Sequence, residues 1–178
     1  SSDVCSSDLG AYGRADAGTP VIDHLAAEGT RFTDVHAQSD FTTASTLSLL
    51  FSQWFTQMVL LRPRSPGPSL ASAFQGQGYS TAAFIGTAVL FDPRVSEGFA
   101  VYRSAALESG GVWSAQRTTD EALRWVQAQR RDHPWFLWLM YWNLHSSDAQ
   151  RDEAQRQRVI SDIDSELGRL LAATRGSA

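Results

Sequence analysis

An unbroken run of eight apolar residues, Trp135–Trp142, constrains the fold of this chain more than any other feature. The run is too short to cross a membrane as a helix, which requires about 20 residues. Its length, and the Pro134 directly before it, favour a strand that is buried on both faces, as in a parallel sheet. Such a strand requires helices on both faces of its sheet.

Helical and strand-like patterns alternate along the rest of the chain. One helix is predicted to be capped by Thr19, to begin at Pro20 and to end at Gly29. Further helices are predicted over Ala44–Gln53, Ser69–Gly78, Trp113–Arg131 and Asp152–Thr174, strands over Thr30–Val35 and Ser80–Ile85, and a loop over Arg62–Pro68. This alternation predicts an α/β fold, with a layered, mainly parallel sheet flanked by helices.

Composition and charge narrow the classes of partner. The 178 residues suffice for about one domain or a large part of one, and the net charge is −4. All 15 basic residues are arginines and form no basic footprint, so we expect no nucleic-acid partner. Cys5 is the single cysteine, which excludes a disulfide within the chain and a cysteine cluster for zinc.

Three short motifs follow one another between Gly10 and Gln38: Gly-x-Tyr-Gly, Thr-Pro-x-Ile-Asp-x-Leu-Ala and Gly-x-x-Phe-x-x-x-x-Ala-Gln. In this order and spacing they resemble the opening of a sulfatase-family domain of the alkaline phosphatase superfamily. The resemblance implies an alkaline-phosphatase-like α/β fold. In that family the metal carboxylates precede the first motif, and an Asp-His pair follows on a later strand. We therefore expect a domain that is incomplete at both ends.

The first nine residues do not match the family pattern. Ser2–Leu9 reads like one translated frame of a common sequencing adaptor, which suggests a metagenomic gene fragment. The alternative is a disordered leader rich in Ser and Asp. We expect residues 1–9 to be such an artefact or leader, and residues 10–178 to form the partial sulfatase-like domain.

The resemblance places the chemistry at Thr42. Aligning the Ser-x-x-Ser-Leu-Leu that begins at Ser45 with the family pattern puts Thr42 at the position of the nucleophile. A hydroxyl just before a helix N-terminus lies beside free N–H groups that favour an anionic ester. A Thr hydroxyl requires activation by a metal, so Thr42 is also the one candidate metal contact within the chain. The alternatives are Thr43 as nucleophile or substrate-binding residue, and simple capping of the helix by both residues.

The motif for conversion to formylglycine, Cys/Ser-x-Pro/Ala-x-Arg, is absent. No cysteine lies at the site, and Thr46 stands at the position of the arginine. Relatives with Thr as nucleophile include phosphodiesterases and phosphoethanolamine transferases. The resemblance therefore favours these types over a formylglycine sulfatase.

Two further residues are candidates for contact with the ester. His145 follows the apolar run in Asn-Leu-His, where many relatives have Asp-Pro-His, and it is expected to act as a general acid or as a donor to developing charge. Arg94, in an Asp-Pro-Arg turn, could bind an oxyanion, although such a turn is more often structural. The alternative for His145 is a loop residue without a role. Asp164 matches a helix pattern of the family, where a role in packing and orientation is expected.

The resemblance also implies a cofactor and a partner. We expect the longer protein to bind a divalent ion (calcium, magnesium, manganese or zinc) that this chain alone does not hold, so the chain itself is expected to be inactive. The expected substrate is a small-molecule or lipid-linked sulfate or phosphate ester, and membrane association is open. Location outside the cytoplasm is favoured. The alternative is a non-catalytic binding or structural module with the same fold.

Overall fold

The computed structural model describes residues 6–60, 67–87, 92–108, 111–145 and 152–174. Its centre is a sheet of three parallel strands in the order β2-β1-β3. The strands are β1 (Ser80–Ile85), β2 (Val101–Ser104) and β3 (Trp135–Met140). In the register of the sheet, Ala82 lies between Val101 and Leu137. The predicted strand Ser80–Ile85 and the parallel α/β architecture are confirmed.

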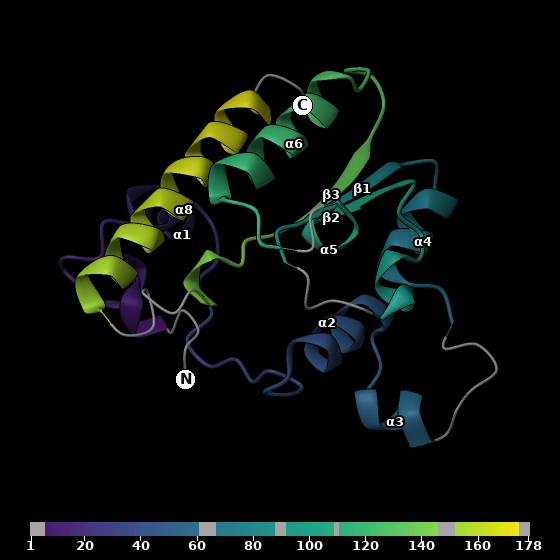
Figure 1. Cartoon of the computed structure of the whole chain (residues 1–178), viewed down its shortest axis with the longest axis horizontal. Helices are drawn as coiled ribbons and strands as arrows, with labels where there is room; N and C mark the ends of the chain where they lie inside the picture. The colour runs from purple at the N-terminus through teal and green to yellow at the C-terminus, as the bar shows by residue number, and fades with distance from the viewer. Residues whose placement is uncertain (1–5, 61–66, 88–91, 109–110, 146–151, 175–178) are drawn as a thin grey trace.

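Helices cover both faces of this sheet (Figure 1). The α-helices are α1 (Pro20–Glu28), α2 (Thr42–Phe51), α3 (Phe55–Leu60), α4 (Leu70–Gly76), α5 (Ala105–Glu108), α6 (Ala115–Gln127) and α8 (Glu153–Thr174). Short 3₁₀ turns are η1 (Ser6–Asp8), η2 (Gly10–Tyr12), η3 (Pro93–Ser96) and η4 (Asn143–His145). α6 and α8 lie on one face, whereas α2 and α4 lie on the other.

The side chains of β1 divide the core into two halves, because successive residues of a strand point to opposite faces. Ala83 and Ile85 pack with α2, whereas Ala82 and Phe84 pack with α6 and α8. All four side chains are at most 1 % exposed. β1 is therefore the doubly buried strand of the described sheet.

Two predictions about strands are wrong. β3 is half-buried along its whole length, because it lies at the edge of the described sheet and pairs there with β1 alone. Thr30–Val35 forms no strand, and its apolar side chains Phe32 and Val35 are 66 % and 72 % exposed. Alternation of apolar residues does not suffice when no neighbouring strand offers hydrogen bonds.

The predicted helices are confirmed with shifted ends. The helix expected over Ala44–Gln53 is α2, which begins at Thr42 and ends at Phe51. Ser69 caps α4 as predicted, since its Oγ accepts a hydrogen bond from the N–H of Ser72 at 3.0 Å. The predicted loop over 62–68 lies mostly outside the described residues. No helix in the described ranges has the length and apolar character needed to span a membrane.

The N-terminus of α1 is capped from the far end of the chain. Thr19 occupies the cap position, but its side chain makes no capping hydrogen bond. Instead, the carboxylate of Asp164 in α8 accepts hydrogen bonds from the N–H groups of Val21 and Ile22 at 3.0 and 2.9 Å. Asp164 is 1 % exposed, and its charge faces the positive end of the α1 dipole. The expected packing role of Asp164 is confirmed.

A second network connects the Gly-x-Tyr-Gly turn to α1. The Thr19 hydroxyl accepts a hydrogen bond from the N–H of Gly10 at 3.1 Å and donates one to Asp23 at 3.1 Å. Asp23 also accepts a hydrogen bond from the N–H of Ala11 at 2.6 Å. A Cβ on Gly10 would lie 2.3 Å from an oxygen of Asp23, so any side chain there would displace this carboxylate from its hydrogen bonds.

The segment before Gly10 is partly described. Asp8 is buried and forms ion pairs with Arg14 at 3.4 Å and with Arg156 of α8 at 2.7 Å. The interpretation of residues 1–9 as an artefact or leader stays a prediction.

Replacing Asp164 tests the capping of α1. Asp164→Ala leaves two buried N–H groups without an acceptor, so we expect the free energy of unfolding to fall by about 1–3 kcal/mol. The exposed Asp162 on the same helix is the matched control, and Asp162→Ala should change stability by less than about 0.5 kcal/mol. Urea denaturation followed by circular dichroism measures both, and equal effects would contradict the assignment.

Replacing Gly10 tests the network around Asp23. Gly10→Ala should destabilise the fold by about 1–3 kcal/mol, because the added methyl group overlaps the carboxylate. Gly76→Ala is the control, since a Cβ there meets no atom within 4 Å. It should be neutral or stabilise α4 by up to about 1 kcal/mol. The midpoint temperature of thermal unfolding should therefore fall for Gly10→Ala, and it should stay the same or rise for Gly76→Ala.

Candidate functional site

The N-terminus of α2 is open. Its cap residue, Phe41, offers no side-chain hydrogen bond, and Thr42 and Thr43 are the first two helical residues. Neither threonine hydroxyl has a hydrogen-bond partner among the described residues. The alternative that Thr42 and Thr43 cap the helix is therefore wrong, because both lie inside it and leave its N–H groups free.

The loop before α2 is held by two serines. The N–H of Phe41 donates to Ser39 Oγ at 3.1 Å, and Ser45 Oγ donates to the Ser39 carbonyl at 2.6 Å. Within the described structure, these bonds leave the N–H groups of Thr42, Thr43 and Ala44 without acceptors. Free N–H groups at the positive end of a helix bind anions well.

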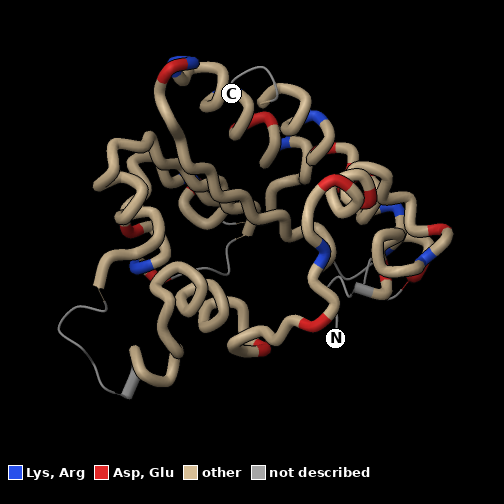
Figure 2. Tube along the Cα trace, turned by 180° about the vertical axis from the view of Figure 1, so that it is seen from behind, with Lys and Arg blue, Asp and Glu red and all other residues tan. Residues whose placement is uncertain are grey.

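The other face of α2 anchors this N-terminus in the core. Leu47 and Leu50 are at most 2 % exposed and pack in one cluster with Ile85 of β1 and Val95 of η3. α2 itself contains no charged residue, whereas Asp40 lies two residues before Thr42, and the pair Asp92 and Arg94 lies at the neighbouring turn η3, so charged positions border the helix (Figure 2). An anion at the N-terminus would therefore meet no carboxylate on α2 itself.

Arg94 lies on η3, which packs against α2. Its guanidinium donates to the carboxylate of Asp92 through Nε at 3.0 Å and Nη2 at 2.6 Å, and its backbone N–H donates at 2.9 Å. The hydrogen bonds from Arg94 lower the pKa of Asp92, and the same contact raises the pKa of Arg94. These contacts favour the structural interpretation of the turn. A role of Arg94 in binding an anion stays a prediction.

His145 lies in η4, past the C-terminal end of β3, as the sequence predicts. Its ring stacks on Trp142, with ring centres 3.8 Å apart and an angle of 13° between the planes. Asn143 of the same turn donates from Nδ2 to the Trp113 carbonyl at 3.0 Å, which fixes η4 against the loop before α6.

The elements that carry Thr42 and His145 pack mainly against different neighbours. η4 packs against α8, whereas α2 packs against α3, α4 and η3. A joint action of Thr42 and His145 on one ester therefore stays a prediction.

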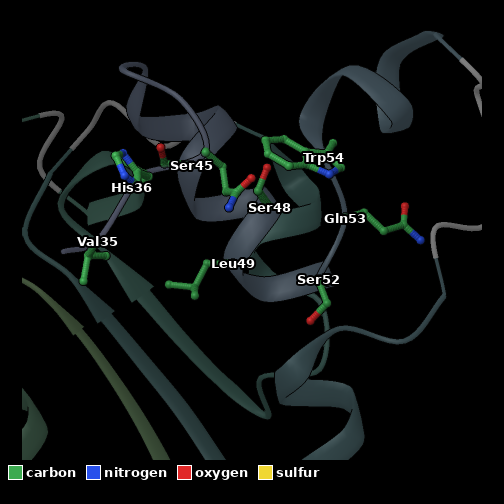
Figure 3. A pocket seen from close by; sticks show the side chains of 10 residues that line it. Val35, His36, Ser45, Ser48, Leu49, Ser52, Gln53 and Trp54 are labelled. Carbon is green, nitrogen blue, oxygen red and sulfur yellow. The ribbon is translucent and has the colours of Figure 1, made fainter. Parts of the chain in front are cut away.

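A cavity of about 520 Å³ opens beside α2, and the sequence did not predict it (Figure 3). Its walls come from residues 35–38, from one side of α2 and from residues 52–54. One feature of the sequence is consistent with the cavity. Leu49, which lines it, stands seven residues after Thr42 and therefore lies on the same face of the helix. His36, directly after the predicted strand Thr30–Val35, lines the cavity.

The described residues do not form a metal centre. Across these ranges, no group of three or more His, Cys, Asp or Glu side chains is arranged to hold a metal ion. The free Thr42 hydroxyl is at most one ligand of such a site. We therefore assign no step of the chemistry to a metal within this chain.

Comparison with known proteins gives one consistent result. The family model described as Sulfatase matches residues 1–173. Arylsulfatase A of Bos taurus is 37 % identical to this chain over 89 residues, which cover 44 % of this chain and 18 % of that protein. The chain thus matches about a fifth of the length of this relative.

The Asp92–Arg94 pair predicts a dependence of stability on pH. Because the pKa of Asp92 is lowered in the folded state, its contribution is complete above the ordinary value of about 3.9 and is lost as the pH falls through the folded value. The pair is partly exposed, so Asp92→Asn should lower the free energy of unfolding by less than about 1 kcal/mol at pH 7, and by progressively less as the pH falls below about 3.9. In an Arg94→Gln background this pH-dependent cost should disappear, and its persistence in urea titrations would contradict the pairing.

Proposed function

The chain belongs to the sulfatase family of hydrolase-type enzymes that act on sulfate esters, and from this premise we propose that it carries the nucleophile segment of a longer, metal-dependent enzyme. That enzyme cleaves or transfers a phosphate or sulfate ester. The supporting observation is the open N-terminus of α2, where free N–H groups and two free hydroxyls lie together.

Thr42 is the proposed nucleophile. Its Oγ lies beside N–H groups that can stabilise negative charge on the non-bridging oxygens of an ester. Thr43, the next residue, contributes a second hydroxyl and N–H group for substrate binding. His145 is the proposed proton donor to the leaving alcohol, and Arg94 a weaker candidate for contact with the ester.

The proposed enzyme is of the phosphodiesterase or phosphoethanolamine-transferase type. The sequence of α2 and of the loop before it contains no cysteine, and Thr46, at the position of the family's arginine, is 6 % exposed. A residue buried in this way does not reach a ligand at the helix N-terminus. The proposed substrate is a small-molecule or lipid-linked ester, and the proposed location is outside the cytoplasm.

The divalent ion belongs to the longer protein in this proposal. The family generally binds such an ion, but the described residues supply too few ligands of their own. The 178-residue chain is therefore proposed to be inactive by itself.

A second candidate function is a non-catalytic binding or structural module. The observation that favours it is the engagement of the Arg94 guanidinium by Asp92, which leaves less of it for an anion. The two functions differ in whether Thr42 is required for turnover in the longer protein.

Replacement of Thr42 tests the proposed chemistry. In the longer protein, Thr42→Ala should lower kcat/KM for bis(4-nitrophenyl) phosphate by at least about 10³-fold, because removal of a nucleophile eliminates the covalent step. Thr43→Val should lower kcat/KM by up to about 10-fold, as expected for loss of one ordinary hydrogen bond. Ser165→Ala on α8, far from α2 in the sequence, is the control, and its kcat/KM should equal that of the unsubstituted protein.

Parallel assays with 4-nitrophenyl sulfate decide the class of ester. Faster turnover of the sulfate than of the phosphodiester would contradict the proposed type. Turnover by the 178-residue chain alone, abolished by Thr42→Ala, would contradict its proposed inactivity. Absence of turnover in the longer protein would favour the non-catalytic module.

A further inference from the structure

One edge of the described sheet is open along β3. The strand pairs with β1 alone, and the pairing runs one to one over its whole length, without a bulge. All residues of β3 are half-buried, and none of them is charged or a proline. Proteins ordinarily protect an edge strand with charges, proline, a bulge or a covering segment. Within β3 itself the first three of these protections are absent.

The hydrogen bonds to β1 show which backbone groups of β3 face the open edge. The N–H of Ser80 donates to the Pro134 carbonyl at 3.0 Å. The N–H of Gly86 donates to the Met140 carbonyl at 2.9 Å. The N–H and C=O of one residue point to the same edge of a strand, and successive residues alternate between the two edges. The even-numbered residues of β3 therefore face β1, and the odd-numbered residues face away from it.

The residues that face away are Trp135, Leu137 and Leu139, and each has one N–H and one C=O. Across the described ranges, none of these donors and acceptors has a hydrogen-bond partner. They recur at every second residue, about 6.6 Å apart at 3.3 Å of rise per residue. Another extended backbone repeats its own donors and acceptors at this spacing, so the partner that fits the edge is a strand.

Apolar side chains line the open edge on both faces of the sheet. Leu137 and Leu139 pack against the core cluster on the side of α6 and α8. Trp138 and Met140 pack against the cluster on the side of α2. A strand added beside β3 would extend both clusters, so its binding is strongest when its residues are apolar on both faces. The matching partner is thus an extended, apolar and uncharged stretch of polypeptide.

A lone segment fits this edge better than a second copy of the chain. α6 packs on β3, and α8 packs on α6 and on η4, the turn that follows β3. In Figure 1, α8 lies on the side of α6 that is away from β1 and β2. Two β3 strands in a shared sheet would be about 4.8 Å apart, whereas packed helices require about 8–10 Å between their axes. The helices of two copies would therefore compete for the same space, whereas a lone strand brings no helix.

We propose that the open edge of β3 binds a separate extended peptide segment, apolar on both faces, which adds to the sheet as a further strand. The unpaired groups of Trp135, Leu137 and Leu139 supply the hydrogen bonds, and the apolar rows beside them select the side chains. This binding does not depend on the chemistry proposed at Thr42, because strand addition requires no turnover.

The test follows amide hydrogen exchange in the 178-residue chain by NMR. The probe is a peptide of six alternating valine and isoleucine residues between pairs of lysines. In the free chain, the amides of Leu137 and Leu139 should exchange at least about 10²-fold faster than those of Trp138 and Met140, which face β1. Saturating peptide should slow exchange at the outward amides by at least about 10-fold. The same peptide with its two central residues replaced by proline should not, since proline cannot donate to the ladder.

Two substitutions at one position separate the backbone from the side chain. Leu137→Pro removes an outward N–H and leaves the bonds to β1 in place, so it should weaken binding of the peptide at least about 10-fold. Leu137→Ala is the matched control, because it loses the same side chain but keeps the N–H, and it should weaken binding by less than about 3-fold. Circular dichroism checks that both variants fold. If Leu137→Pro does not fold, the exchange pattern and the proline-containing peptide decide.

The other occupants of the edge give different results. Slow exchange of the outward amides in the dilute chain without peptide overturns the proposal, because the chain then covers its own edge. Protection that grows with the concentration of the chain, with a doubled molecular mass in light scattering, overturns the lone segment in favour of a second copy. Equal protection by the two peptides, or equal binding to the two variants, overturns strand addition.

Discussion

The contact between Asp164 and the first turn of α1 is the interaction on which the described arrangement depends. It joins residues 143 positions apart in the sequence and satisfies two N–H groups that the helix itself cannot satisfy. A carboxylate that is 1 % exposed is tolerated only where donors and a favourable dipole surround it. Because α8 also packs on α6, which covers the sheet, this contact ties the N-terminal motifs to the sheet.

The same contact gives the recognisable N-terminal motifs a physical meaning. Thr19 is free to bond the Gly10 turn because Asp164 has taken over the capping of α1. Asp23 then closes the network onto Ala11, and Gly10 leaves space for its carboxylate. The residues that carry the family resemblance in this segment are thus those that fix the turn to the helix.

Elements that are determined by residues close together in the sequence were predicted correctly. Ser69, with its cap, and the apolar run of β1 were predicted correctly, because their determinants lie within a few residues. The burial of β3 and the expected strand over 30–35 were wrong, because both depend on neighbouring strands. The Asp164 cap and the cavity beside α2 depend on contacts between distant segments, which sequence reasoning did not predict.

α2 combines a well-packed core face with an N-terminus that is open to a ligand. Its buried face, with Leu47 and Leu50, packs in one core cluster with Ile85 of β1, while Leu49 on another face is 60 % exposed and the N-terminus has no side-chain cap. A binding group is positioned most accurately when it projects from a rigid element. The uncapped N-terminus forgoes the stabilisation of about 1 kcal/mol that a capping side chain would give. A helix can tolerate that loss when its core face is well packed, which makes α2 the element best suited to hold an anionic group.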